Sequence, residues 1–176
     1  LGVTSSSIVS RVRRLYGAAK AGHGGTLDPM ASGLLPVAFG EATKTISYVM
    51  NGLKIYQFTI RWGESRTTDD VEGEIIASSE RRPDIIAIKN ALKFFVGEIE
   101  QVPPLYSAIK VNGKRAYDLA RNNIPVKLKP RIIYVERFTL TGVPDSDHAT
   151  FEVVAGKGSY MRGLARDLAL HLGTVG

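Results

Sequence analysis

The sequence predicts an α+β fold built on a mixed, largely antiparallel β-sheet with flanking helices. Several segments alternate apolar and polar residues, the pattern of a half-buried strand. Between them lie segments whose apolar residues recur at helical spacing, in no strict strand–helix–strand repeat. We find no internal repeat, low-complexity tract or linker, and 176 residues with 44% hydrophobic content suffice for one core. We therefore expect one folding unit over residues 1–176.

The first half of the chain is expected to contain two helices, a strand and a long loop. Residues 6–16 place apolar side chains at helical spacing with arginines on the other side, which predicts an amphipathic helix. Residues 22–40 hold five glycines and two prolines, which favours a tightly turned loop over a regular element. Residues 56–62 alternate as a strand does, and the polar run over residues 63–73 ends it. Asp84 is placed to cap the second helix.

The second half is expected to alternate strands with helices. Gly97 and the pair Pro103-Pro104 bar the second helix from continuing, and Asn112-Gly113 predicts a tight turn. The periodicities predict strands over residues 106–111, 131–141 and 149–155, and helices over residues 114–121 and 160–172.

The residue types limit the chemistry that the chain can perform. Cysteine is absent, which excludes disulfides, thiol nucleophiles and cysteine-ligated metal sites. The three histidines, His23, His148 and His171, are too scattered to suggest a zinc cluster. We therefore expect chemistry without metal or cofactor. No stretch approaches the roughly 18 consecutive apolar residues of a membrane span, and the N-terminal residues lack the apolar core of a secretory signal, so a cytoplasmic protein is expected.

Positive charge is concentrated in one segment. Between residues 101 and 131, a single acid, Asp118, stands against seven basic residues: Lys110, Lys114, Arg115, Arg121, Lys127, Lys129 and Arg131. This segment therefore carries a net charge equal to the +6 of the whole chain. Such a cluster suits a polyanion, because each contact of Lys or Arg with a phosphate releases counterions. A solvated face that keeps the protein soluble is the alternative, and charge alone leaves both open.

An aspartate in the glycine-rich loop is the strongest candidate for a catalytic group. Asp28 directly precedes Pro29, and proline restricts the backbone of the residue before it. A carboxylate held in this way suits catalysis, although Asp in such loops also commonly satisfies the donors of a turn. Two other interpretations of the glycines fail, because the chain contains neither the phosphate-binding G-x-x-x-x-G-K-[ST] pattern nor the G-x-S-x-G of an esterase.

Several separated motifs carry more information together than any one of them. The segment from Gly22 to Lys44 reads GHGGTLDPMASGLLPVAFGEATK. Around it stand GVTSS at residues 2–6, KIY at residues 54–56, TTDDVEG at residues 67–73, QVPPLYSA at residues 101–108 and GSYMR at residues 158–162. In this order the motifs resemble those of the bacterial pseudouridine synthase B family, over nearly the whole chain. The resemblance implies the pseudouridine synthase fold.

The resemblance also implies a reaction and the residues that perform it. The family isomerises the uridine at position 55 in the TΨC arm of tRNA, flipping the base and using no cofactor or metal. By matching motif, Asp28 is the essential carboxylate, which either attacks covalently or removes a sugar proton to give a glycal. Tyr56 would stack on the flipped uracil and assist a late proton transfer, and Arg162 would pair with Asp28. From the residues alone, Tyr56 is equally a buried strand aromatic and Arg162 an exposed helix residue.

Further residues are expected to bind the RNA. His23 would help to hold the arm open near the displaced bases, and the expected substrate contacts are His23, Thr26, Asp70, Lys110 and Tyr160. Contacts to the RNA backbone are expected from Lys114, Arg115, Arg121, Lys127 and Lys129.

Two parts of the family pattern are missing, one before the opening motif and one after residue 176. We therefore expect a catalytic domain truncated at both ends, without the family's C-terminal RNA-binding domain. A monomer that binds tRNA and needs no protein partner or membrane is expected. Two alternatives stay open: a catalytically silent RNA-binding module, and a guide-RNA-dependent synthase, because the guide-dependent relatives share the Asp motif.

Overall fold

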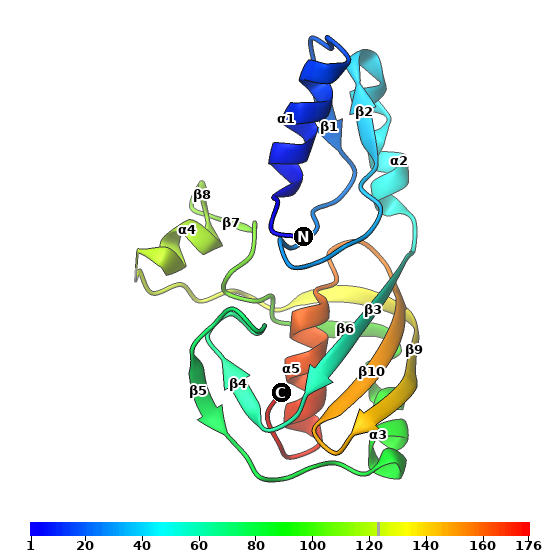
Figure 1. The fold of residues 1–176 in the computed structure, drawn as a ribbon, viewed down its shortest axis with the longest axis vertical. Helices are drawn as coiled ribbons and strands as arrows, with labels where there is room; N and C mark the ends of the chain where they lie inside the picture. The colour runs from blue at the N-terminus through cyan, green and yellow to red at the C-terminus, as the bar shows by residue number, and fades with distance from the viewer. Residues whose placement is uncertain (123) are drawn as a thin grey trace. The chain divides into compact units, whose positions relative to one another are not determined.

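The computed structural model describes residues 1–122 and 124–176. Their contacts group into two compact units, residues 1–52 and 53–176, and each unit is described by itself (Figure 1). The prediction of one folding unit concerns cooperative unfolding and stays a prediction. In the described part of the chain, no helix is long and apolar enough to cross a membrane.

The first unit contains a long helix, a two-stranded ribbon and a short second helix. Its elements are α1 (Ser5–Leu15), β1 (Ala21–His23), β2 (Val37–Phe39), the 3-10 turn η1 (Gly40–Lys44) and α2 (Ile46–Asn51). α1 confirms the amphipathic helix predicted over residues 6–16, and Thr4 caps it, because its Oγ1 accepts a 3.2 Å hydrogen bond from Ser7 N. The predicted loop over residues 22–40 is wrong at its two ends, where β1 and β2 pair antiparallel. Each strand has only three residues, too few to show a period.

The second unit is built on a four-stranded antiparallel sheet in the order β3-β10-β9-β6. The strands are β3 (Lys54–Arg61), β6 (Gly97–Gln101), β9 (Arg131–Asp145) and β10 (His148–Ala155). The alternation predicted for β3 is confirmed, since Tyr56, Phe58 and Ile60 pack on the core side while Gln57 and Thr59 are exposed. Helices and antiparallel strands together confirm the predicted α+β class.

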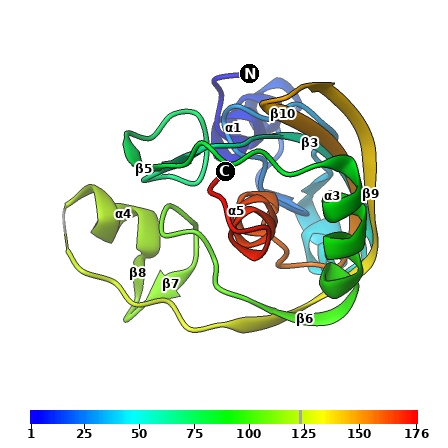
Figure 2. The ribbon, with the colours of Figure 1, turned by 90° about the horizontal axis from the view of Figure 1, so that it is seen from below.

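Two helices cover one face of this sheet. α3 (Ile85–Ala91) continues as η2 (Leu92–Phe95), and α5 is Met161–His171. Both helices lie inside the curve of the sheet (Figure 2). Asp84 caps α3 as predicted, because its Oδ1 accepts a 2.7 Å hydrogen bond from Ala87 N. Leu164, Leu168 and Leu172 of the last helix are buried against the sheet, as the spacing predicted.

Two small ribbons lie outside this sheet. They are β4 (Glu64–Arg66) with β5 (Ile75–Ser78), and β7 (Lys110–Val111) with β8 (Lys114–Arg115); the second ribbon leads into α4 (Ala116–Arg121). Asn112 and Gly113 form the predicted turn, and their φ angles of 50° and 83° are the left-handed values that such a hairpin requires. The β4–β5 ribbon was not predicted, because its first strand lies inside the polar run over residues 63–73.

Two sequence-based elements near this second ribbon are partly wrong. Only the last two residues of the strand predicted over 106–111 are a strand. The carbonyls of Ser107 and Ile109 instead accept hydrogen bonds of 3.1 and 2.7 Å from Tyr117 N and Ala116 N, at the start of α4. The helix predicted over residues 114–121 begins later, at Ala116, because Lys114 and Arg115 pair with β7.

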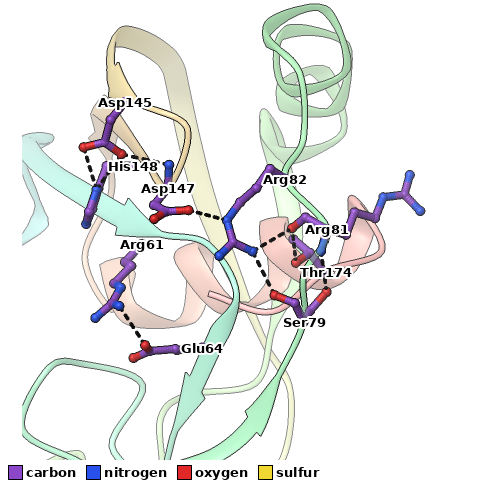
Figure 3. Close-up of polar contacts among 9 residues, drawn as sticks. All are labelled: Arg61, Glu64, Ser79, Arg81, Arg82, Asp145, Asp147, His148 and Thr174. Atoms are coloured by element: carbon purple, nitrogen blue, oxygen red, sulfur yellow. Dashed lines mark hydrogen bonds and ion pairs between the residues drawn. The ribbon is translucent and has the colours of Figure 1, made fainter.

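A polar junction closes the end of the second unit shown in Figure 3. Arg82 donates from Nε to Asp147 Oδ1 at 2.6 Å and from Nη1 to the Ser79 carbonyl at 2.8 Å. Thr174 Oγ1 donates to the Arg81 carbonyl at 2.9 Å. Beside it, a hydrogen bond from His148 lowers the pKa of the Asp145 carboxyl. These contacts tie the chain before α3 to the β9–β10 turn and to the segment after α5.

Candidate active site

Asp28 lies on the loop between β1 and β2, in the first unit, and the loop is fastened on both sides of it. Leu27 N donates to Ser5 Oγ at 2.9 Å, and the same hydroxyl donates to the Leu27 carbonyl at 3.3 Å. Ser5 is only 5% exposed. On the other side, Gly2 N donates to the Pro29 carbonyl at 2.7 Å. The backbone at Asp28 is therefore held at both neighbours while Asp28 itself is exposed.

His23 is the last residue of β1, and Thr26 lies on the loop that carries Asp28. Nδ1 of His23 is hydrogen-bonded to the Gly25 carbonyl, so one nitrogen of the ring is used in shaping the loop. Gly24 is buried where its N donates to the Pro36 carbonyl at 2.9 Å, and a Cβ there would come within 3.3 Å of Ile46. Thr26 is exposed. The contacts of these residues with substrate stay predictions.

Tyr56 lies on β3 in the second unit and is half-buried against the core. Burial raises the pKa of its hydroxyl, so the phenol stays protonated at neutral pH and can donate a hydrogen bond. Two residues earlier, burial and, to a smaller extent, the charge of Lys157 lower the pKa of Lys54.

The start of α5 is held by one buried side chain. Gln101, 2% exposed, accepts a 2.9 Å hydrogen bond from Tyr160 N at Oε1 and donates from Nε2 to the Tyr160 carbonyl at 3.0 Å. Gly163 permits this approach, because a Cβ there would lie 2.9 Å from the Gln101 amide nitrogen. The backbone of Tyr160 is thus bound to Gln101, and this contact positions the helix that carries Arg162. The predicted contact of Tyr160 with substrate stays a prediction.

Arg162 projects from the first turn of α5 to three oxygen atoms. Nη1 donates to the Thr68 carbonyl at 2.8 Å, Nη2 donates to the Tyr106 carbonyl at 3.0 Å, and Asp70 Oδ2 lies 3.4 Å from Nη1. The side chain is 13% exposed. The interpretation of Arg162 as an exposed helix residue is therefore wrong, and its predicted pairing with Asp28 of the first unit stays a prediction.

The partner Asp70 belongs to a tight turn between β4 and β5. Its Oδ1 accepts hydrogen bonds from Thr68 Oγ1 at 2.5 Å and from Glu72 N at 3.0 Å, which leaves Oδ2 facing Arg162. Glycine is needed at residue 73, at the end of the turn, because a Cβ there would lie 2.5 Å from Thr68 Oγ1. This arrangement orients the carboxylate of Asp70 toward the arginine; its predicted contact with substrate stays a prediction.

The sequence analysis missed two residues of this site, Arg166 and Asp69. Arg166 Nη1 donates to Asp69 Oδ2 at 2.9 Å, directly beside the contact between Arg162 and the turn. Its distance of four residues from Arg162 indicated that both side chains lie on the same side of the helix. Its partner could not be inferred, because Asp69 lies 97 residues away in the sequence.

The basic segment lies on the surface of the second unit. All seven of its Lys and Arg residues are exposed: Lys110, Lys114, Arg115, Arg121, Lys127, Lys129 and Arg131. They lie on β7, β8, the end of α4, the stretch that leads to β9, and the first residue of that strand. The Arg121 guanidinium lies 5.6 Å from the centre of the Tyr117 ring, an arrangement that exposes charge beside an aromatic face.

The structure thus brings together part of the predicted set within each unit. In the first unit, Asp28 and Thr26 share the loop that follows His23 at the end of β1. Arg162 and Asp70 meet in the second unit, which also carries Tyr56 and the basic segment. Among the described residues, no group of three or more His, Asp or Glu could hold a metal ion. Chemistry without metal or cofactor stays a prediction.

Comparison with known proteins decides the family. The model of the TruB family pseudouridylate synthase N-terminal domain matches residues 13–161. The chain belongs to the TruB family. Two curated TruB relatives are tRNA pseudouridine synthases B, from Rhodospirillum rubrum (60% identical over 100% of this chain) and Gluconacetobacter diazotrophicus (58% over 99%). This TruB chain spans 57% of the length of each of them.

A solved structure supports the same assignment at the level of fold. The TruB chain is similar to one in the crystal structure of a Cbf5-Nop10-Gar1 complex, with a TM-score of 0.72 and 28% identity, over 99% of this chain and 42% of the other. The predicted pseudouridine synthase fold is therefore confirmed.

Proposed function

We propose that this chain is the catalytic part of a tRNA pseudouridine synthase that isomerises the uridine at position 55 in the TΨC arm, with Asp28 as the essential carboxylate. The observation that carries the proposal is the Asp28 loop. The residues on either side of Asp28 are held by hydrogen bonds to Ser5 and Gly2. The motif lies within a chain 60% identical to a tRNA pseudouridine synthase B. A pre-positioned carboxylate lowers the entropy that the reaction must lose.

The reaction needs few groups. The N1–C1′ glycosidic bond of uridine breaks, the freed uracil turns, C5 bonds to C1′, the proton on C5 leaves, and N1 takes up a proton. Asp28 either forms a covalent bond to the sugar or the base, or removes a sugar proton to give a glycal. Both roles require the carboxylate to reach the sugar or the base, and Asp28 is exposed on its loop.

Tyr56 and Arg162 are proposed to complete the site. The half-buried ring suits stacking on the flipped base, and its oxygen is proposed to assist the late removal of the proton from C5. The guanidinium of Arg162 is oriented by the carbonyls of Thr68 and Tyr106 and by Asp70. A guanidinium held in this way favours the charged form of a nearby carboxylate. We propose that this carboxylate is Asp28.

The substrate is proposed to be held by shape and phosphate contacts. Seven exposed basic residues in one segment, with one acid among them, suit the phosphates of a folded RNA arm. We propose that the chain binds tRNA as a cytoplasmic monomer, without an obligatory protein partner. The curated relatives at 58–60% identity are named tRNA pseudouridine synthase B, whereas the chain of the Cbf5-Nop10-Gar1 complex is 28% identical. The high identity to the tRNA pseudouridine synthases B favours the stand-alone enzyme over the guide-RNA-dependent alternative.

The test is release of tritium from a TΨC stem-loop that carries 5-tritiated uridine. The parent chain is compared with Asp28→Asn and, as a matched control, with Glu41→Gln, which removes an exposed acid of the same unit. We expect release by the parent and by the control, none by Asp28→Asn, and RNA binding by all three. Binding by all three without release by any would support the silent RNA-binding module, and equal release by parent and Asp28→Asn would overturn the role of Asp28.

A further inference from the structure

The side chain of Arg166 is engaged on all three of its nitrogen atoms. Nη1 donates to Asp69 Oδ2 at 2.9 Å, Nε donates to Asp167 Oδ1 at 2.9 Å, and Nη2 donates to the Val102 carbonyl at 2.7 Å. The Asp69 and Arg166 side chains are 15% and 21% exposed. Three of its five N–H donors are used, one on each nitrogen, so the guanidinium is fixed in direction.

Arg166 repeats the connections that Arg162 makes one helical turn earlier. Each arginine of α5 joins the turn between β4 and β5 to the chain after β6: Arg162 through Thr68 and Tyr106, and Arg166 through Asp69 and Val102. Together the two arginines contact three successive residues of the turn, Thr68, Asp69 and Asp70.

The turn needs such a restraint, because Asp69 has a left-handed backbone with a φ of 54°. A residue with a Cβ rarely adopts that conformation, and the conformational free energy that it costs must be offset by the surroundings. The ion pair with Arg166 and a 3.1 Å hydrogen bond from Asp69 N to the Arg66 carbonyl supply this support. The next residue, Asp70, is the one whose Oδ2 faces Arg162.

We propose that Asp69 and Arg166 are positioning residues, which hold the turn so that Asp70 and Thr68 orient the Arg162 guanidinium for catalysis. This inference rests on the proposed function, in which Arg162 acts beside the catalytic carboxylate. Arg166 itself does not touch substrate in this scheme; it acts through the turn.

Burial and charge oppose one another at this pair. Burial raises the pKa of the Asp69 carboxyl, and attraction to Arg166 and Arg162 lowers it only in part. At Arg166 burial lowers the pKa, but Asp167 and Asp69 together raise it by more. A buried ion pair is not by itself evidence of added stability. This pair joins the turn to α5 through a hydrogen bond of fixed direction.

The test uses Asp69→Asn, which removes the charge but keeps the shape and tolerates a left-handed backbone. Arg166→Lys is the second variant, and it retains the charge without the fork of donors. The matched control is Asp147→Asn, which breaks the Arg82–Asp147 pair at the other end of the same unit. Each is measured for single-turnover tritium release, for stem-loop affinity, for melting temperature, and for water exchange of the Arg162 side-chain protons in ¹⁵N-arginine-labelled protein.

In Asp69→Asn we expect the single-turnover rate constant to fall on the order of 10- to 100-fold with Kd within about two-fold, because misplaced catalytic groups lose rate rather than binding. The Arg162 protons should exchange faster, Arg166→Lys should lie between parent and Asp69→Asn, and Asp147→Asn should match the parent. Unchanged Arg162 exchange in both variants would overturn the proposal, as would rate losses that follow melting temperature across all three. The exchange measurement needs no activity, so a parent that releases no tritium would defeat the proposed function while the positioning role is still decided.

Discussion

Removal of the Tyr56 hydroxyl distinguishes the two interpretations of this residue, a buried strand aromatic and a group that acts on the flipped uracil. A packing aromatic needs only the ring, whereas a group that assists proton transfer at C5 needs the oxygen. We expect Tyr56→Phe to bind the stem-loop as the parent does, and to lose about 10²-fold or more in single-turnover tritium release, the usual contribution of a general acid or base. Melting temperature serves as the control for folding. A variant as fast as the parent would identify Tyr56 as a core aromatic.

The Asp69 carboxyl gives the stability of the chain a particular dependence on pH. Burial raises the pKa of this group in the folded chain, so the folded state holds the proton more tightly than the unfolded state. The free energy of unfolding that it contributes therefore falls as the pH rises from the unfolded pKa, about 4, through the folded value. Asp69→Asn does not titrate. We expect the unfolding free energy of this variant, minus that of the parent, to increase with pH in urea unfolding experiments. A decrease would mean that attraction to Arg166 outweighs burial.

At the scale of elements, the segment before β9 concentrates charge that the fold leaves exposed. Lys127 and Lys129 are both exposed there. We expect Lys127→Ala with Lys129→Ala to weaken stem-loop binding and to reduce the slope of log K against log salt by about one to two, since each phosphate contact contributes roughly 0.7 to 0.9. Lys89→Ala with Lys93→Ala, on α3 and η2, is the matched control for charge. Equal losses in the two double variants would indicate a diffuse effect of net charge.

Periodicity predicted the longer elements that bury one face, whereas contacts with other segments determine the short ones. The strand at β3 and the helices α1, α3 and α5 were predicted because their apolar residues recur over enough residues to show a period. β1, β2 and β7 are two or three residues long, too short to show a period, and pairing with another strand defines them. The residues of the candidate site show the same contrast between local patterns and contacts with other segments. Asp28 was found from a local motif, while the contact of Arg162 with Thr68 spans 94 residues of sequence, which no local pattern can indicate.

At the scale of the whole molecule, the two units differ in how much core they bury. In residues 1–52, Val9 and Ala38 are the buried hydrophobic residues, and the rest of the core lies in residues 53–176. A unit of that size with so little buried apolar surface is not expected to fold alone. We therefore predict one cooperative transition for the chain, and an unfolded circular dichroism spectrum for a peptide of residues 1–52.

Trp62 makes this prediction measurable, because it is the only tryptophan of the chain and lies 1% exposed in the second unit. Its fluorescence reports that unit alone, while far-ultraviolet circular dichroism reports the helices of both. Coincident transitions by the two probes would support one folding unit. Separate midpoints would show that the first unit melts by itself.

The amide of Gln101 also offers a way to make the assembly of this site titratable. It holds the start of α5 by giving one hydrogen bond and accepting one, a pairing that a protonated glutamic acid reproduces and a glutamate does not. Glutamate at residue 101 would thus couple the anchoring of the helix that carries Arg162 and Arg166 to a single proton. Acidification would then assemble the arginine contacts and neutralisation would release them, giving an engineered switch in a chain that contains no cysteine for a redox one.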